Sequence, residues 1–166
     1  CALDIETCAK VAGQFPDAEE DPVVTVSCVF SAQGEVPAGL REAGVQRYKV
    51  FERRVYVLGD VCDPIPGVIV VKCATEELLL AEVRNELHVR KRVGCVTGHN
   101  ILGYDMEYMM TRAWHDALDQ DVAQVFARFG NALYRKPRPV VKQLSSASFG
   151  QNELVFLNPC GFYYSD

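Results

Sequence analysis

The arrangement of hydrophobic and polar positions predicts several short strands in the first half of the chain. Residues 1–7 are mostly apolar, with two acidic residues placed one residue apart. Residues 23–30 are β-branched and almost continuously apolar, as expected of a buried strand. Turns rich in Gly, Asp and Pro separate the apolar segments. The predicted strands are residues 1–7, residues 23–30, a segment within residues 45–58, and residues 68–73.

Further along the chain, the apolar positions take the spacing of helices. Thr75 has the properties of a helix N-cap, and Leu79, Val83 and Leu87 recur every four residues on one helical face. A second amphipathic helix begins at about Asp105, and its apolar stripe includes three methionines. The other predicted elements are a strand at residues 93–97, a helix near residues 121–129, a hairpin of residues 140–148 and 153–157, and a strand near residues 161–166.

This order of elements predicts an α/β fold. A leading meander of strands followed by strand–helix units favours a mixed sheet with helices packed on it. A length of 166 residues favours one domain, and 49% hydrophobic residues can supply its core. No repeat or linker divides the chain. Because the chain begins without methionine and both ends fall within predicted strands, we expect it to be part of a longer protein.

Charge and cysteine content narrow the possible functions. A net charge of −5 argues against a broad phosphate-binding surface, although a nucleic-acid enzyme with a metal-binding pocket also needs acidic residues. The seven cysteines include no C-x-x-C pair, which argues against a zinc site and against a disulfide framework. We therefore expect reduced thiols in a cytosolic or nuclear compartment. No run approaches the roughly 18 to 20 apolar residues of a membrane span, so no membrane partner is expected.

The first strand carries the clearest sign of chemistry. Alternation along a strand places the side chains of Asp4 and Glu6 on one face. Two carboxylates on a mostly apolar strand repel each other and are costly to desolvate, and a divalent cation relieves both effects. Carboxylate oxygens are hard ligands that suit Mg²⁺ or Mn²⁺. The alternative is a frayed strand end whose acids simply face water.

A second acidic element follows the strand at residues 93–97. The turn Gly98-His99-Asn100 leads into a helix whose first acid is Asp105. Sites in α/β sheets lie beyond the carboxyl ends of strands, so this carboxylate could meet those of the first strand. Asn100 could hydrogen-bond the site or a ligand. The alternative for Asp105 is ordinary helix capping, in which Asp is a favoured residue.

Together the two acidic elements resemble the exonuclease domain of family B DNA polymerases. Asp4-Ile5-Glu6 is similar to the first exonuclease motif of that family, and the Gly-His-Asn-Ile-Leu-Gly-Tyr-Asp segment at residues 98–105 is similar to the second. Residues 15–24 resemble the segment that follows the first motif in delta-type members. Residues 145–153 resemble the hairpin segment of the family, and residues 161–166 the strand after it. The third motif, Tyr-x-x-x-Asp on a later helix, is expected beyond residue 166.

The resemblance implies a ribonuclease-H-like fold with an inserted β-hairpin, of which residues 1–166 form a single partial domain. It implies 3′–5′ proofreading, in which Asp4, Glu6 and Asp105 are the catalytic residues and bind two Mg²⁺ or Mn²⁺ ions. Asn100 and Tyr104 are then expected to contact the single-stranded 3′ end. Phe15 is a further candidate for stacking on bases, although burial in the core is the favoured interpretation for both aromatic residues.

The resemblance also implies partners. These are a single-stranded DNA 3′ end, primer-template DNA, the remainder of the polymerase chain, a sliding clamp and accessory subunits, in a nucleus or at a viral replication site. The parent protein is expected to be a DNA-directed DNA polymerase, and this portion alone is expected to be inactive because one carboxylate is missing. Two alternatives stay open: an exonuclease-like module retained for structure without activity, and a free-standing ribonuclease-H-like nuclease.

Overall fold

The computed structural model describes residues 1–33, 48–115, 139–146, 150–157 and 163–165. The helix predicted near residues 121–129 lies outside the described residues. Each strand predicted from the sequence is present. The strands are β1 (Ala2–Thr7), β2 (Val23–Gln33), β3 (Tyr48–Leu58), β4 (Ile69–Cys73), β5 (Cys95–Thr97), β6 (Pro139–Ser146), β7 (Gly150–Leu157) and β8 (Tyr163–Ser165). The described helices are α2 (Glu76–Arg84), the π-helical segment η1 (Asn85–Arg90) that continues it, and α3 (Asp105–His115).

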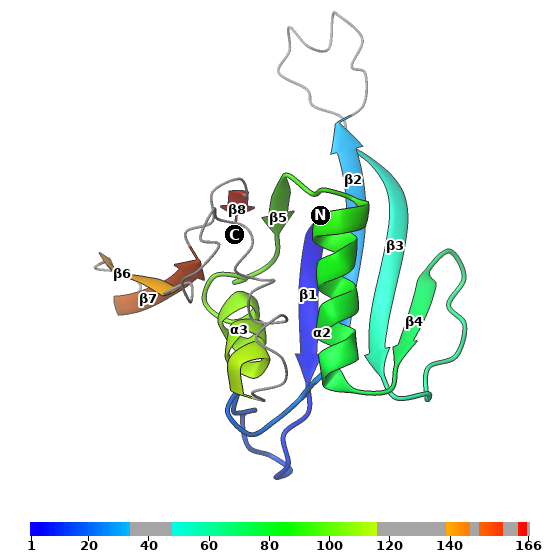
Figure 1. Cartoon of the computed structure of the whole chain (residues 1–166). Helices are drawn as coiled ribbons and strands as arrows, with labels where there is room; N and C mark the ends of the chain where they lie inside the picture. Colours follow the sequence, from blue (N-terminus) through cyan, green and yellow to red (C-terminus); the bar gives the residue numbers. More distant parts are fainter. Residues whose placement is uncertain (34–47, 116–138, 147–149, 158–162, 166) are drawn as a thin grey trace, which may run out of the picture.

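Six of the strands form one mixed sheet in the order β4-β3-β2-β1-β5-β8. The first three strands are an antiparallel meander, in which β1 pairs with β2 and β2 pairs with β3. The other three run parallel to their neighbours: β4 to β3, β5 to β1 and β8 to β5. Figure 1 shows α2 lying across the face of the meander. The predicted α/β fold with a mixed sheet is therefore confirmed.

The predicted hairpin is also present, as a separate two-stranded antiparallel sheet of β6 and β7. The pairing runs from Pro139 opposite Leu157 to Ser146 opposite Gly150. Its bounds differ from the prediction: β6 begins at Pro139 rather than at residue 140, and β7 begins at Gly150 rather than at residue 153. A proline is tolerated as the first residue of a strand, where its missing N–H interrupts no inner part of the ladder.

Thr75 caps the N-terminus of helix α2, as the sequence predicts. The Thr75 hydroxyl accepts a hydrogen bond from the Leu78 N–H at 3.2 Å, which satisfies one of the unpaired donors of the first turn. Leu79, Val83 and, in η1, Leu87 are all buried against the sheet. Burying each of these side chains stabilises the fold by about 1.5–3 kcal/mol. An Asp at position 83 would therefore place a charge inside this contact.

The π-helical segment η1 brings a charged residue into the interior. Glu86 is 1% exposed and lies among three cations. Its carboxylate is 2.7 Å from Arg90, 3.2 Å from Arg54 and 3.7 Å from Lys91. The basic residues at the end of this helix thus have a structural role, because a buried carboxylate is tolerated only when cations or hydrogen bonds compensate it.

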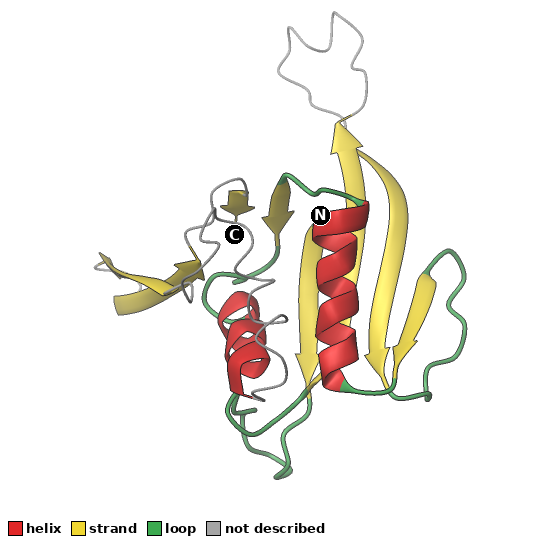
Figure 2. Cartoon of the chain, viewed as in Figure 1, coloured by secondary structure: helices red, strands yellow, loops and turns green. Residues whose placement is uncertain are grey.

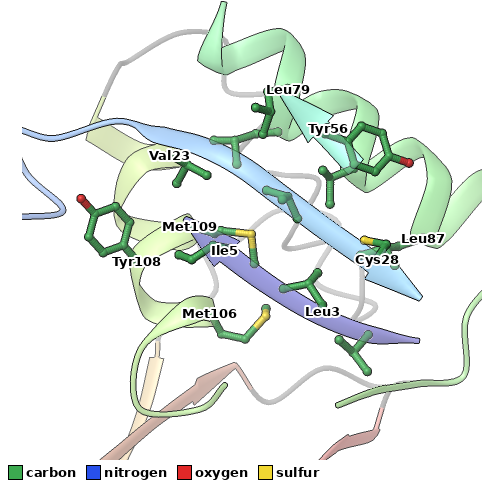
Figure 3. Close-up of a cluster of buried hydrophobic side chains, with 14 of the residues drawn as sticks. Leu3, Ile5, Val23, Cys28, Tyr56, Leu79, Leu87, Met106, Tyr108 and Met109 are labelled. Carbon is green, nitrogen blue, oxygen red and sulfur yellow. The ribbon is translucent and has the colours of Figure 1, made fainter. Parts of the chain in front are cut away.

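Helix α3 packs its methionine stripe against β1. Met106 and Met109 are buried and point toward Leu3 and Ile5, so the core of the first strand is closed by this helix (Figure 3). The six cysteines that fall in the described residues are free thiols. Among the described helices, none has the length and apolar character needed to cross a membrane.

Candidate functional site

Strand β1 separates an apolar face from an acidic one. Leu3 and Ile5 are 3% and 5% exposed and belong to the core. Asp4 and Glu6 alternate with them and are exposed. The two carboxylates therefore project from the same face of one strand, away from the core, as the alternation predicts.

Asp105 lies against the edge of this strand. Strand β5 pairs only with the start of β1, where the Thr97 N–H donates to the Cys1 carbonyl at 2.8 Å. Strand β5 ends at Thr97 and does not reach the second half of β1. Figure 1 shows α3 beyond the end of β5, beside the second half of β1. The Asp105 carboxylate accepts a hydrogen bond from the Ile5 N–H at 2.9 Å and is 3% exposed. The side chain thus satisfies a buried backbone donor that β5 is too short to reach.

The turn between β5 and α3 determines where Asp105 lies. A Cβ atom at Gly98 would overlap the Leu3 carbonyl oxygen, so only glycine permits this close approach of the turn to β1. Asn100 has φ 52°, and its carbonyl accepts hydrogen bonds from the Gly103 and Tyr104 N–H groups at 3.0 Å each. Asn100 is exposed, and its side-chain amide folds over Gly103. The amide is therefore on the surface of the turn, next to the start of α3.

Two aromatic rings lie beside the end of β1. The Tyr104 and Thr7 hydroxyl groups are 3.1 Å apart, and the Tyr104 ring is half-buried. The Phe15 ring meets it edge-on, with 5.6 Å between the ring centroids. Phe15 is 79% exposed, so the expectation that it is buried in the core is wrong. Its ring packs against Tyr104, outside the core cluster that includes Met106 and Met109.

Phe15 belongs to a segment, residues 8–22, that we call the Phe15 loop (green in Figure 2). Asp21 folds this loop back on itself: its carboxylate accepts the Lys10 N–H at 2.9 Å and the Asp17 N–H at 2.8 Å. These two N–H donors lower the pKa of Asp21 below its ordinary value. The Tyr108 hydroxyl donates to the Asp21 carbonyl at 3.0 Å, and burial raises the pKa of Tyr108 to about 12. The hydroxyl therefore keeps its proton, and its hydrogen bond, at physiological pH.

Arg112 makes a second attachment to the loop. One guanidinium nitrogen, Nη1, donates to the carbonyls of Ala18 and Glu19, each at 3.3 Å. The Nε and Nη2 atoms donate to the Glu76 carboxylate at 3.0 Å and 2.7 Å. Glu76 also accepts the Val23 N–H at 2.8 Å. This connection between α3, α2, β2 and the loop was not predicted from the sequence, where only the four-residue spacing of Tyr104, Tyr108 and Arg112 gives a sign of it.

A cleft of roughly 490 Å³ separates the Phe15 loop from α3. Its walls carry aromatic rings together with carboxylates, and these carboxylates would repel the phosphates of a nucleic acid. The aromatic surface is therefore the part of the cleft suited to an unpaired base. The lining residues are Phe15, Pro16, Asp17, Ala18 and Glu19 from the loop, Gly103 and Tyr104 from the turn before α3, and Glu107, Tyr108 and Thr111 from α3.

The acids at this site have the ligand chemistry of a hard cation. Asp4, Glu6 and Asp105 offer carboxylate oxygens, which Mg²⁺ and Mn²⁺ prefer, so the donor set fits such an ion. In the part of the chain that the structure describes, no three or more His, Cys, Asp or Glu side chains are already gathered around one ion position. Asp4 and Glu6 are exposed, however, and exposed side chains change rotamer within nanoseconds. The pair can therefore adjust to an ion while Asp105 stays fixed by the Ile5 N–H.

The chain is similar in sequence to a family of known proteins. A family model described as the exonuclease domain of DNA polymerase family B matches residues 1–156. The chain is 32% identical over 115 residues to the DNA polymerase delta catalytic subunit of Caenorhabditis elegans, covering 68% of this chain and 9% of that protein. It is 38% identical over 114 residues to the DNA polymerase catalytic subunit of Tupaiid herpesvirus 1, covering 68% and 9%. It is 30% identical over 163 residues to the delta catalytic subunit of Plasmodium falciparum, covering 96% and 13%. The chain thus spans only about a tenth of the length of these relatives.

Proposed function

The chain belongs to the exonuclease domain of family B DNA polymerases, and from this membership we propose that it excises nucleotides from a single-stranded 3′ end of DNA within a larger polymerase. One observation supports this most strongly. The Asp105 carboxylate binds the N–H of Ile5, the residue that separates Asp4 from Glu6, although Asp105 is 100 residues away in sequence. Two acidic elements held together in this way would supply three of the carboxylate ligands for two-metal phosphodiester hydrolysis.

We further propose that the domain is ribonuclease-H-like and that β6 and β7 are a hairpin inserted into it. The antiparallel meander, the parallel strands β5 and β8 and the separate two-stranded sheet support this reading. Residues 1–166 are then one partial domain, and the third exonuclease motif and the polymerase domain belong to the parent chain beyond it. The relatives are polymerase catalytic subunits, which favours a polymerase over a free-standing nuclease.

Asp4, Glu6 and Asp105 are the proposed catalytic residues and would hold two Mg²⁺ or Mn²⁺ ions together with an acid of the third motif. When bound, such ions supply charge neutralisation at the phosphate and activation of the attacking water. The protein's own part is to hold these acids on rigid elements. Asp105 is fixed by the Ile5 N–H and by the first turn of α3, whereas Asp4 and Glu6 are fixed in their backbone by the pairing of β1 with β2.

The proposed substrate is a frayed 3′ end, because only an unpaired base can stack on the exposed aromatic edge. Stacking on an aromatic side chain contributes about 1–3 kcal/mol per base. Phe15 and Tyr104 offer this edge beside the end of β1, and the exposed amide of Asn100 would help to position the strand. Primer-template DNA, the rest of the polymerase, a sliding clamp and accessory subunits are the proposed partners, in a nucleus or at a viral replication site.

The test is a paired substitution in the parent polymerase. Asp4→Ala with Glu6→Ala is expected to abolish digestion of a 3′ single-stranded oligonucleotide while nucleotide addition continues. The matched control is Asp60→Ala with Asp63→Ala, which removes two exposed acids from a turn remote from β1 and should leave both activities unchanged. Excision that persists in the Asp4–Glu6 variant would show that the assigned roles are wrong.

One observation favours a second candidate, an exonuclease-like module kept for structure. The described residues do not already surround an ion position with three ligands. On this alternative the wild-type parent would extend primers and would not shorten a mismatched 3′ end at any concentration of Mg²⁺ or Mn²⁺. The same assay therefore separates the two candidates before any variant is made.

The 166-residue chain by itself is expected to show little or no excision, because one ligand carboxylate is proposed to come from the third motif of the parent. Metal-dependent shortening of a 3′ single-stranded oligonucleotide by the purified chain would contradict this expectation. Activity of the parent under the same conditions is the control.

A further inference from the structure

The start of α3, with Tyr104 just before it, lies along the second half of the Phe15 loop. Tyr104, Tyr108 and Arg112 recur every four residues, so their side chains lie in one row on the helix. Each member of this row contacts the loop at a different point. Tyr104 meets the Phe15 ring, Tyr108 donates to the Asp21 carbonyl, and Arg112 donates to the carbonyls of Ala18 and Glu19.

Arg112 is the member of this row that is held most firmly. Its side chain is 8% exposed, and Glu76 engages it through two nitrogens, which fixes the plane of the guanidinium. The remaining nitrogen, Nη1, then points at two carbonyls that follow Phe15 by three and four residues. Glu76 is fixed in turn because it also accepts the Val23 N–H at the start of β2. The loop is thus attached to the sheet and to α2 through one side chain.

We infer that Arg112 is a positioning residue for substrate: it holds the Phe15 loop so that the Phe15 ring stays against Tyr104, at the end of the acidic strand β1. The inference rests on the proposed function, because it assigns a role in binding the 3′ strand. The ring itself is 79% exposed and has few contacts of its own to keep it in place. Its orientation therefore depends on the backbone of the loop, and Arg112 binds that backbone where it returns toward β2.

The first experiment measures whether the loop is held, independently of any excision. In the parent polymerase, a glutamate-specific protease is used to cleave after Glu19 and Glu20, and the released peptides are followed by mass spectrometry. Cleavage reports the population in which the loop is open. Arg112→Gln is expected to increase the rate at this site at least about tenfold, since two charge-assisted hydrogen bonds are lost. Arg112→Lys, which keeps the charge and loses the planar fork, is expected to give an intermediate rate.

The matched control is Arg90→Gln. Arg90 also bridges two carboxylates, Glu82 and Glu86, and it makes none of the contacts described for the Phe15 loop. Its loss should leave cleavage at Glu19 and Glu20 unchanged. An equal increase in both variants would mean that the protease reports general loosening, and the inference would be overturned.

The second experiment asks whether Arg112 acts through Phe15. Phe15→Ala is safe for folding because the ring is mostly exposed, and it should raise KM for a 3′ single-stranded oligonucleotide. Arg112→Gln should raise KM by about tenfold and change kcat by less than about threefold, because it moves a binding group and not a reacting one. In the Phe15→Ala background the same substitution should add less than about twofold. A full additional tenfold would show that Arg112 acts on the fold as a whole and would overturn the inference.

The two proposals fail in distinguishable ways. A wild-type parent that does not excise would overturn the proposed function, whatever the protease experiment shows about the loop. A parent that excises, with loop cleavage unchanged in both Arg112 variants, would overturn the role of Arg112 and leave the nuclease assignment standing.

Discussion

Asp105 combines a structural task with the proposed catalytic one, and two substitutions separate them. Its carboxylate satisfies the buried N–H of Ile5, so Asp105→Ala leaves that donor without the partner it has now. A buried unsatisfied N–H costs about 1–3 kcal/mol. A cost of about 2 kcal/mol corresponds to a roughly 30-fold larger population of the opened strand edge, since each 1.4 kcal/mol is about tenfold.

Asp105→Asn removes the negative charge and keeps an oxygen that can accept the same hydrogen bond. We expect the opened population of β1 to change by less than about fivefold in this variant, because exchanging a charged acceptor for a neutral one costs about 1 kcal/mol and the Ile5 N–H keeps its partner. Excision should nevertheless fall by about 100-fold or more in both variants, since a neutral amide is a poor ligand for a hard cation.

The assay uses the parent polymerase. Hydrogen–deuterium exchange, followed by mass spectrometry of the peptide that contains β1, measures the opening of the Ile5 amide. Digestion of a 3′ single-stranded oligonucleotide measures excision. Exchange that speeds up equally in the Asn and Ala variants would show that the Asp105 side chain does not protect the Ile5 N–H by accepting its hydrogen bond. Excision retained by Asp105→Asn would refute the catalytic part.

Three further substitutions test the contacts that support the fold around the site. Gly98→Ala should destabilise the domain by about 2–3 kcal/mol in chemical denaturation, because a Cβ atom there meets the Leu3 carbonyl, which is backbone and cannot turn away; a change below about 0.5 kcal/mol would contradict the close approach. The pKa of Asp21 is lowered from an ordinary value of 3.8, so the stability it adds is complete above that value and is lost as pH falls through the folded pKa. In urea titrations of Asp21→Asn, the free energy of unfolding should therefore fall less steeply below about pH 4 than in the wild type. An unchanged pH dependence in this range would disprove the role of Asp21. Glu86→Ala should cost about 1.5–3 kcal/mol in the same denaturation assay, because Arg54 and Arg90 each lose one charged partner while keeping Glu52 and Glu82, and a change below about 0.5 kcal/mol would contradict this role.

Much of the fold could be predicted because its signals are local. The alternation along residues 1–7 places Asp4 and Glu6 on one face whatever β1 pairs with, and the N-cap at Thr75 needs only the residues that follow it. The methionine stripe of α3 is likewise apolar at helical spacing and is buried. The hairpin was predicted from its turn, although its strands extend further than their apolar residues indicate, because pairing continues wherever backbone groups face each other.

The arrangement of the site depends on contacts between residues far apart in sequence, which no local pattern specifies. The exposed position of Phe15 could not be predicted, since an aromatic residue in a polar segment is equally compatible with burial, and the inner side of α3 was filled by other side chains. The pairing of Arg112 with Glu76 joins residues on two different helices. Nothing in the spacing of either helix specifies that the two residues face each other.

By itself the sequence determined which residues are strand, which are helix, and which acids share a face, since the periods of 2 and 3.6 residues act over a few neighbours. Only the tertiary structure decided that β5 ends where it does, so that Asp105 takes up the Ile5 N–H that β5 leaves unpaired. The physical reason is that a buried donor must be satisfied by whatever group the packing brings to it. That group came from 100 residues away.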